Sequence, residues 1–463
     1  MAADFKELGL FGAKLLREKG ADYGELFFER RFTFSGRCED NRIENLSCSV
    51  ELGVGIRLIK DFKTYFGFTN RLTQESIKRL IEEISYASAT ADGAVIDMEV
   101  SQRPPRYEKV VEGLSFELPV EKKVEFLRRA NEAARTYGER IKQVSAILRD
   151  QVQEVVIVNT EGEIVEDIRP RVVFLVQVVA SDGLELQTGY EPVGHLGDYS
   201  ILEKITPEEI AKRAAERALK MLKARPAPAG SFTVILSSSA GGTMIHEAVG
   251  HGLEADLVNQ GLSVYAGKVG QKVASSLITV IDDGSMRGKY GSSGYDDEGA
   301  PTQRNVLIEE GILKGYMFDA LEAFKSGAQL TGNGRRQSYR HAPMPRMTNT
   351  YIAPADTPPE QIVEDTKEGI LVLKMGGGQV NTVNGDFVFE VSEAHLIENG
   401  KITEPIRGAT LIGNGPKVLM EIDAVGSDLN FSIGTCGKDG QGVPVSDGIP
   451  TIRIPKITVG GVG

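Results

Sequence analysis

The sequence of 463 residues contains no tryptophan and only three cysteines, Cys38, Cys48 and Cys436. So few cysteines in so long a chain exclude a disulfide framework, and a cysteine with a special role would be a thiolate ligand or a nucleophile. The chain also lacks long apolar runs: a stretch such as 172–176 is far too short to span a bilayer, and no apolar segment follows a basic head at the start. We therefore expect a cytoplasmic protein without a membrane segment.

Basic residues are not in excess either. The chain has 53 Lys and Arg against 65 Asp and Glu, a formal net charge of −12, and no basic block. Because contacts to phosphates supply most of the affinity for nucleic acids, we expect no nucleic-acid partner. With 41% hydrophobic and 25% charged residues, the composition excludes disordered, collagen-like and coiled-coil classes. The length fits two large domains or about three of average size.

The first half of the chain mixes helical and strand patterns. Apolar residues at helical spacing predict a helix near 5–15, and strict alternation from Val50 to Leu58 predicts a half-buried sheet. Further helices are predicted at about 74–90 and 121–136, and further strands at about 142–149, 153–158, 171–180 and 184–190. The capping box Thr206-x-x-Glu209, with Pro207 in the first helical position, predicts one more helix.

The second half has a different character. Many short strands with glycine-rich turns predict a mostly β region, with hairpin signals at Glu310-Gly311 and Asn399-Gly400. Helical patterns interrupt the strands at about 240–254, directly after the apolar strand 232–236, and near Pro358.

The stretch 224–231, Ala-Arg-Pro-Ala-Pro-Ala-Gly-Ser, predicts a short, stiff connector between the halves, because its prolines and glycine suit a linker better than a buried element. We therefore predict an α+β protein with two domains. The first, over residues 1–226, is an α/β domain with a largely antiparallel sheet. The second, over 227–463, is β-rich, like a barrel or a sandwich, and carries the helix at 240–254.

The densest group of reactive side chains is His246-Glu247-Ala248-Val249-Gly250-His251. In the related pattern HExxH, two histidines four residues apart bind zinc from one helical face and the glutamate acts on water. Here the spacing is five, which in a straight helix turns the imidazoles about 140° apart and separates their Cα atoms by about 7.5 Å along the axis. Sharing one zinc therefore requires a distortion. Gly250 permits it, since glycine can take non-helical dihedral angles and let the helix end or bulge.

The spacing alone does not distinguish a metal site from two structural histidines that lie near each other by chance. Two histidines also leave a catalytic zinc one protein ligand short. Cys436 is one candidate: it lies in the glycine-rich stretch 434–442, for which we expect a flexible loop, and an inert thiol is its alternative interpretation. Glu254 and Asp256 are other candidates, although such carboxylates are more typical of a solvated helix end. His341 fits an electrophile, a hydrogen-bond donor behind the ligands, or a structural hydrogen-bonding residue.

Three separated blocks resemble the signature blocks of the TldD/PmbA family, on its TldD side: HEAVGHGLEAD (246–256), GRRQSYRHAPMPRMTNTY (334–351) and GTCGKDGQGVPVSDGIPTIR (434–453). They occur in the family's order, and the resemblance extends over essentially the whole chain. It implies an N-terminal α/β domain and a β-rich C-terminal domain that holds a zinc site. By position, the implied zinc ligands are His246, His251 and Cys436, and the implied catalytic glutamate is Glu247.

The resemblance also implies an activity and an assembly. The expected protein is a zinc metallopeptidase for unstructured peptides, in which Glu247 assists the attack of zinc-activated water on the peptide carbonyl. His341 is a candidate substrate-binding residue. The expected assembly is a homodimer, or a heterodimer with a paralogue that lacks the HExxxH motif. The alternative is a non-catalytic, zinc-stabilised scaffold or subunit of such a complex, which would have no use for a carboxylate beside a ligand.

Overall fold

The computed structural model describes residues 2–88, 100–106 and 118–461. The first half of the chain forms one large sheet with the strand order β3-β2-β1-β5-β6-β4, and β7 also pairs with β6. Its strands are β1 (Tyr23–Glu39), β2 (Arg42–Lys60), β3 (Lys63–Thr69), β4 (Ser101–Arg103), β5 (Ile141–Asn159), β6 (Glu163–Ser181) and β7 (Leu186–Leu196). All these pairings are antiparallel except that of β4 with β6. The largely antiparallel sheet is thus confirmed.

Helices cover this sheet at two places. They are α1 (Ala2–Glu18), α2 (Gln74–Ser88), α3 (Val120–Arg135), α4 (Ile201–Lys204) and α5 (Pro207–Leu222). The apolar sides of α1 and α2 pack on one end of β1 and β2, and those of α3 and α5 pack on β5 and β6. The predicted cap of α5 is confirmed, because the Thr206 side chain accepts a hydrogen bond from the Glu209 N–H. Of the helix predicted at 74–90, residues 89 and 90 lie outside the described residues.

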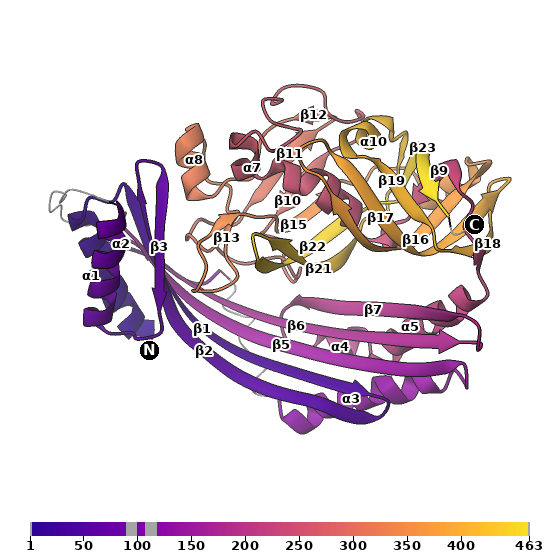
Figure 1. Cartoon of the computed structure of the whole chain (residues 1–463), viewed down its shortest axis with the longest axis horizontal. Coiled ribbons are helices and arrows are strands. Elements are labelled where there is room, and N and C mark those ends of the chain that lie inside the picture. The colour runs from indigo at the N-terminus through magenta and orange to yellow at the C-terminus, as the bar shows by residue number, and fades with distance from the viewer. Residues whose placement is uncertain (1, 89–99, 107–117, 462–463) are drawn as a thin grey trace.

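The stretch from Val50 to Leu58, where a half-buried sheet is predicted, is exposed at Val50 and Leu52 and buried on both faces from residue 53 on. Every residue from 53 to 59 in β2 is buried. Val54 and Ile56 pack under α1 and α2, while the opposite face meets the C-terminal region, where a Cβ on Gly55 would lie 2.4 Å from the Tyr339 carbonyl oxygen. Figure 1 shows the C-terminal region along the concave side of the curved sheet and α3 on its convex side. The half-buried prediction is therefore wrong, because protein replaces solvent on the polar side of the alternation.

The predicted connector is largely exposed, but part of it forms a strand. Arg225 and Pro226 form the short strand β8 (Arg225–Pro226), which pairs in parallel with Ile406 and Arg407 of β18 (Lys401–Arg407). The flanking Ala227 is buried. Residues 225 and 226 thus already belong to the sheet of the C-terminal region, and the division of the chain into domains 1–226 and 227–463 stays a prediction.

The C-terminal region contains a closed barrel. The path β16-β9-β23-β19-β17 closes on itself because β16 also pairs with β17, which makes a five-stranded barrel. Its strands are β9 (Gly230–Leu236), β16 (Glu368–Val380), β17 (Asp386–Glu398), β19 (Thr410–Asn414) and β23 (Ile452–Gly460). The sheet extends beyond the barrel through β18, β8 and β20 (Ala424–Val425). The predicted α+β class with a β-rich C-terminal region is confirmed.

A second, six-stranded sheet lies in the same region, with the order β12-β11-β10-β15-β22-β21. Its strands are β10 (Val280–Asp283), β11 (Arg304–Glu309), β12 (Ile312–Leu313), β15 (Asn349–Ile352), β21 (Asn430–Lys438) and β22 (Gln441–Ile449). The remaining elements are β13 (Gly334–Arg335), β14 (Met344–Pro345), α6 (Thr243–Ile245), α7 (Ala255–Asn259), α8 (Ala320–Ser326), α9 (Pro359–Glu364) and α10 (Gly415–Glu421). Among the residues that the structure describes, we find no helix with the length and apolar content needed to cross a bilayer.

Candidate metal centre

The helical segment that carries the HExxxH motif is distorted at the motif itself. After β9 the chain forms α6, then a π-helical turn over His246–Gly250 and a 3₁₀ turn over His251–Leu253. In the π turn, the His251 N–H donates to the His246 carbonyl oxygen, five residues back, so residues at this spacing come together. The two imidazole centroids lie 5.1 Å apart with their planes at 89°. The expected distortion is confirmed.

Gly250 contributes to this turn by its lack of a side chain. Its dihedral angles, φ −55° and ψ −54°, are those of a right-handed helix, so the expected non-helical conformation is not found. A Cβ at this position would instead lie 2.0 Å from the Sδ atom of Met347. Glycine is favoured here because a Cβ would force the side chain of the buried Met347 to shift.

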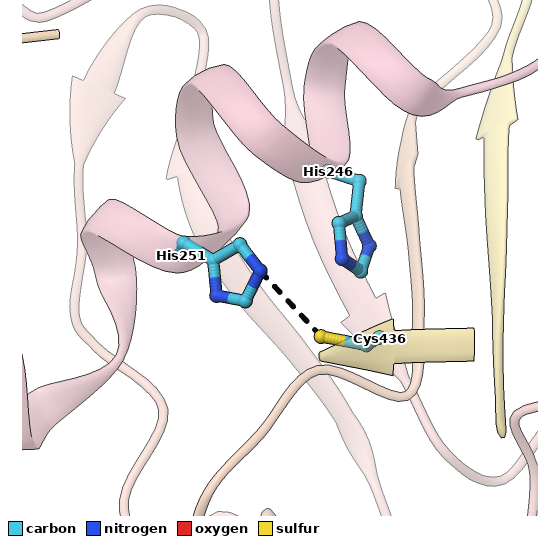
Figure 2. Close-up of side chains that lie close together, drawn as sticks. All are labelled: His246, His251 and Cys436. Carbon is cyan, nitrogen blue, oxygen red and sulfur yellow. Dashed lines mark hydrogen bonds between the residues drawn. The ribbon is translucent and has the colours of Figure 1, made fainter. Parts of the chain in front are cut away.

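The structure brings His246 and His251 together with Cys436. One ligand atom from each of the three side chains lies within 4.8 Å of the others, and all three residues are buried. The Cys436 Sγ lies 3.5 Å from His251 Nε2, and Figure 2 shows the His246 imidazole directed toward the same space. The two segments that meet here are 185 residues apart in the sequence. This arrangement offers two imidazole nitrogens and one sulfur to a single ion.

Cys436 occupies a regular strand instead of a flexible loop. It lies in β21 and faces Val443 of β22 across an antiparallel hairpin. The hairpin turns at Asp439 and Gly440, which have φ angles of 49° and 73°. Asp-Gly with two positive φ angles is the signal for a two-residue hairpin, and this signal could have located the strand from the sequence. The strand fixes the position of the sulfur.

Each histidine is held by a buried carboxylate. His246 Nδ1 lies 2.7 Å from an Asp447 oxygen, and His251 Nδ1 lies 2.9 Å from a Glu254 oxygen. A carboxylate that accepts a hydrogen bond from the Nδ1–H fixes the tautomer and leaves Nε2 as the metal ligand. Asp447 was missed by sequence reasoning although it lies in the third block, because its position opposite His246 depends on the packing of β22 against the distorted helix.

Glu254 is neither a metal ligand nor a solvated helix end, but a buried anion that holds His251. It is fully buried and accepts a hydrogen bond from the Lys438 amine at 2.9 Å, and Arg346 lies 4.0 Å away. Burial alone would raise its pKa, but His251, Lys438 and Arg346 lower it to about 2. It is therefore an anion in neutral solution. Neither Glu254 nor Asp256, which binds Lys438 at 2.7 Å, joins the cluster of possible ligand atoms found in the described residues.

The electrostatics of the cluster favour the ligand form of the cysteine. Burial raises the pKa of the Cys436 thiol, but hydrogen bonds with His246 and His251, and their charge, lower it to about 5. The thiol is thus an anion at neutral pH, which is the form that binds metals. Burial lowers the pKa of His251, whereas Glu254 and Cys436 raise it to about 10. The site without an ion is therefore protonated on nitrogen, and metal binding should release protons.

Glu247 lies beside the first histidine and is half-buried. Within the parts of the chain that the structure describes, its carboxylate makes no hydrogen bond or ion pair, so it is available to another molecule. Burial raises its pKa, and the nearby charges of His246 and His251 lower it. His341 lies outside the cluster: its Nδ1 is 2.9 Å from the Ser338 hydroxyl, and its substrate-binding role stays a prediction.

Three family models match successive parts of the chain. Residues 24–91 match domain 1 of the PmbA/TldA metallopeptidases, residues 114–222 match their central domain, and residues 229–461 match their C-terminal domain. These matches cover most of the sequence.

Similar proteins agree with these matches. The metalloprotease TldD homolog of Haemophilus influenzae is 39% identical over 459 residues, which cover 96% of this chain and 94% of that protein. The zinc metalloprotease TldD homolog of Saccharolobus solfataricus is 29% identical over 459 residues, which cover 97% of this chain and 98% of that protein.

Solved structures share the fold. A crystal structure from Thermotoga maritima, described as a modulator of a DNA gyrase, has a TM-score of 0.82 at 23% identity and covers 98% of this chain and 100% of its own. The crystal structure of TldE from Thermococcus kodakarensis has a TM-score of 0.76 at 21% identity, and the match covers 99% of this chain and 100% of the TldE chain.

Proposed function

The chain belongs to the TldD/PmbA family of metallopeptidases, and from this premise we propose that it is a zinc-dependent peptidase that hydrolyses unstructured peptides. One observation carries the proposal. The side chains of His246, His251 and Cys436 converge from two distant segments, with the unengaged carboxylate of Glu247 next to the first of them.

The donor set fits zinc. Imidazole nitrogen and thiolate sulfur are the ligands that zinc prefers, and a catalytic zinc takes three protein ligands and keeps one position open. His246 and His251 each have Nδ1 engaged by a carboxylate and Nε2 left for the ion. The zinc metalloprotease homologue from Saccharolobus solfataricus supports the choice of metal. His246, His251 and Cys436 would hold the ion.

Zinc bound there would polarise a peptide carbonyl and bring the pKa of water down to about 7. Glu247 accepts the proton of the attacking water and then donates it to the leaving amine. The partial burial that raises the pKa of Glu247 makes its carboxylate a stronger base for this transfer. Asp447 and Glu254 keep the two imidazoles in the orientation that the ligands require.

The substrate is an extended segment. β21 pairs only with β22 among the described strands, so its other edge has unpaired main-chain groups. A peptide added to such an edge is held by main-chain hydrogen bonds, which bind without reading side chains. We therefore propose loose selectivity for sequence and exclusion of folded proteins, which cannot supply an extended strand.

The proposed assembly is a dimer, either of this chain or with a paralogue that lacks the HExxxH motif. The shared fold with TldE supports a partner of the same architecture. All three cysteines are free, which supports a reducing, cytoplasmic setting. A zinc-stabilised scaffold without activity is the second candidate, and the free carboxylate of Glu247 argues against it.

The test compares Glu247→Gln with the parent for zinc content and for hydrolysis of short peptides, with and without the paralogue. The amide keeps the shape but cannot accept the proton, so zinc content should stay at about one per chain and hydrolysis should fall by about 10²- to 10⁴-fold. The matched control is Glu121→Gln on the exposed surface of α3, which should retain activity. Equal hydrolysis by Glu247→Gln and the parent would refute the assignment.

A second measurement tests the substrate class. The active protein should cut several unrelated short peptides and the unfolded form of a stable protein, but not its folded form. Efficient cutting of the folded form, or of one peptide alone, would contradict the proposal.

A further inference from the structure

Three adjoining cavities form one cleft between the large N-terminal sheet and the C-terminal region. Their volumes are about 170, 330 and 650 Å³. The first two share Arg171 and Thr435 in their walls, and the last two share Ile433. Tyr290 lines all three. We call this space the cationic cleft.

The strand β21 connects the cationic cleft with the metal centre. Its residues 430–435 line the cleft, and the next residue, Cys436, is the sulfur of the candidate site. Successive side chains of a strand point to opposite faces, so Thr435 faces the cleft while Cys436 faces the histidines. Figure 1 shows β21 and β22 above the concave side of the N-terminal sheet. A peptide held along β21 would therefore lie in the cleft.

The charge of the cleft is opposite to that of the whole chain. Of the residues that line its three cavities, twelve are Lys or Arg and five are Asp or Glu, whereas the chain as a whole has a net charge of −12. Ion pairs engage several of these groups of both signs, as between Glu393 and Arg217 or between Arg169 and Asp297, and they leave other cations of the lining, such as Arg171 and Arg335, without one among the described residues. A cleft lined by one sign of charge focuses its field and attracts ligands of the other sign.

Two buried arginines that line the smallest of the three cavities have no ion-pair partner in the described part of the chain. Arg171 donates to the carbonyl oxygens of Tyr290 and Ser292, at 3.0 and 2.8 Å, and Arg335 donates to that of Pro444 at 2.8 Å. Among the described residues, neither has a carboxylate oxygen within 4.0 Å, although both side chains are buried. Burial and neighbouring arginines lower the pKa of Arg171 to about 9. A guanidinium buried without an anion is costly, so the site is built for one.

A third arginine, Arg336, is buried and lines the same cavity. Within the described ranges of the chain, its Nε and Nη1 have no hydrogen-bond partner. Its Nη2 donates to Glu25 at 2.8 Å, and its guanidinium lies over the Phe27 ring at 4.6 Å from the centroid. This cavity of about 170 Å³ holds several waters at about 30 Å³ each, or the carboxylate of a side chain in their place.

We propose that the cationic cleft binds acidic segments of extended peptides, with one peptide carboxylate placed at Arg171 and Arg335. The inference rests on the proposed peptidase function and adds a charge preference to it. A guanidinium fork matches a carboxylate in shape as well as charge. The free edge of β21 provides main-chain partners that a peptide can use and a nucleic acid cannot. The acidic surface of the rest of the chain also disfavours a nucleic acid.

The experiment measures binding of two labelled decapeptides to the full-length, zinc-loaded Glu247→Gln variant by fluorescence anisotropy. One peptide carries five glutamates, and the other carries glutamine at the same places. The acidic peptide should bind at least about tenfold tighter, and the difference should shrink as salt is raised.

In the same background, Arg149→Glu with Arg287→Glu reverses two exposed cations of the cleft. This change should reduce the preference to less than about threefold. The control, Lys14→Glu with Lys417→Glu, makes the same change of charge at exposed positions outside the cleft and should keep the preference. Thermal melting and zinc content should be equal in all three proteins.

Equal binding of both peptides by the Glu247→Gln protein would overturn the proposal. An equal loss of the preference for the acidic peptide in the two double variants would also overturn it. So would displacement of the acidic peptide by an equimolar oligothymidylate, which would assign the cleft to nucleic acid. The proposed function is tested separately, with Glu247 intact. Hydrolysis of the glutamine peptide without any charge preference removes only the cleft proposal, and a charge preference without hydrolysis removes only the peptidase.

Discussion

Replacing Asp447 should weaken zinc binding without unfolding the protein. The Asp447 carboxylate lies 2.7 Å from His246 Nδ1 and is the only described group that contacts this nitrogen. The Asn side-chain oxygen can still accept a hydrogen bond from the Nδ1–H but has no charge, so Asp447→Asn makes the imidazole a weaker ligand. Ala removes the acceptor as well and leaves a buried N–H without a partner.

Replacing a carboxylate that hydrogen-bonds to a zinc-binding histidine lowers the affinity for zinc by about 10- to 100-fold, or about 1.4 to 2.8 kcal/mol. We assign the lower value to Asp447→Asn and the upper value to Asp447→Ala. The assay is competition for zinc against a chromophoric chelator at fixed pH. The matched control is Asp439→Asn in the exposed turn of the same hairpin, where φ is 49° and Asn is well tolerated. If Asp447→Ala binds zinc as tightly as Asp439→Asn, the carboxylate does not support the ligand.

Three further predictions follow from the same contacts. His246→Ala, His251→Ala and Cys436→Ala should each lower zinc below about one per chain, and full occupancy in Cys436→Ala would remove the cysteine from the ligand set. Gly250→Ala should cost about 1–3 kcal/mol in urea unfolding because its Cβ meets Met347, and adding Met347→Ala should cost less than the two single changes predict together. Burial raises the pKa of Glu393, but Lys220 and Arg217 lower it below its ordinary value, so the contacts of Glu393 with these two cations contribute stability that is fully present above about pH 4.3 and is lost as the pH falls through the lowered pKa. Glu393→Gln should therefore destabilise the protein at pH 7 and destabilise it progressively less as the pH falls below about 4.3; an effect that stays constant as the pH is lowered would contradict this.

The sequence was most informative where the constraint is local. The spacing of five between His246 and His251 requires a distortion if both bind one ion, and the structure contains a π-helical turn at that place. The cap of α5 was predictable for a similar reason, since Thr206 and Glu209 interact within one turn. In both cases the relevant atoms are separated by a few residues, and the backbone geometry between them has few alternatives.

The partners of the ligands were not predictable. Asp447 reaches His246 across 201 residues, through the register of β22 and its packing on the helix. Glu254 was accessible in principle, because it lies three residues from His251 in a helical segment. Its burial could not be predicted, since it depends on Lys438 and Arg346 from two other parts of the chain.

The polar face of the N-terminal sheet shows the same limit on a larger scale, and it also shows why the cationic cleft is informative. Alternation along β2 correctly separates two faces, but it cannot say whether solvent or protein covers the polar one. Where protein covers it, the charges are matched: buried Arg57 pairs with Glu25 at 2.9 Å and also contacts Glu298 of the C-terminal region. Along the cleft on the same side of the sheet, buried Arg171 has no such partner among the described residues. Since the chain supplies a carboxylate to Arg57 in the covered part of this face and none within ion-pair distance of Arg171 in the cleft, an anion for Arg171 is expected from another molecule.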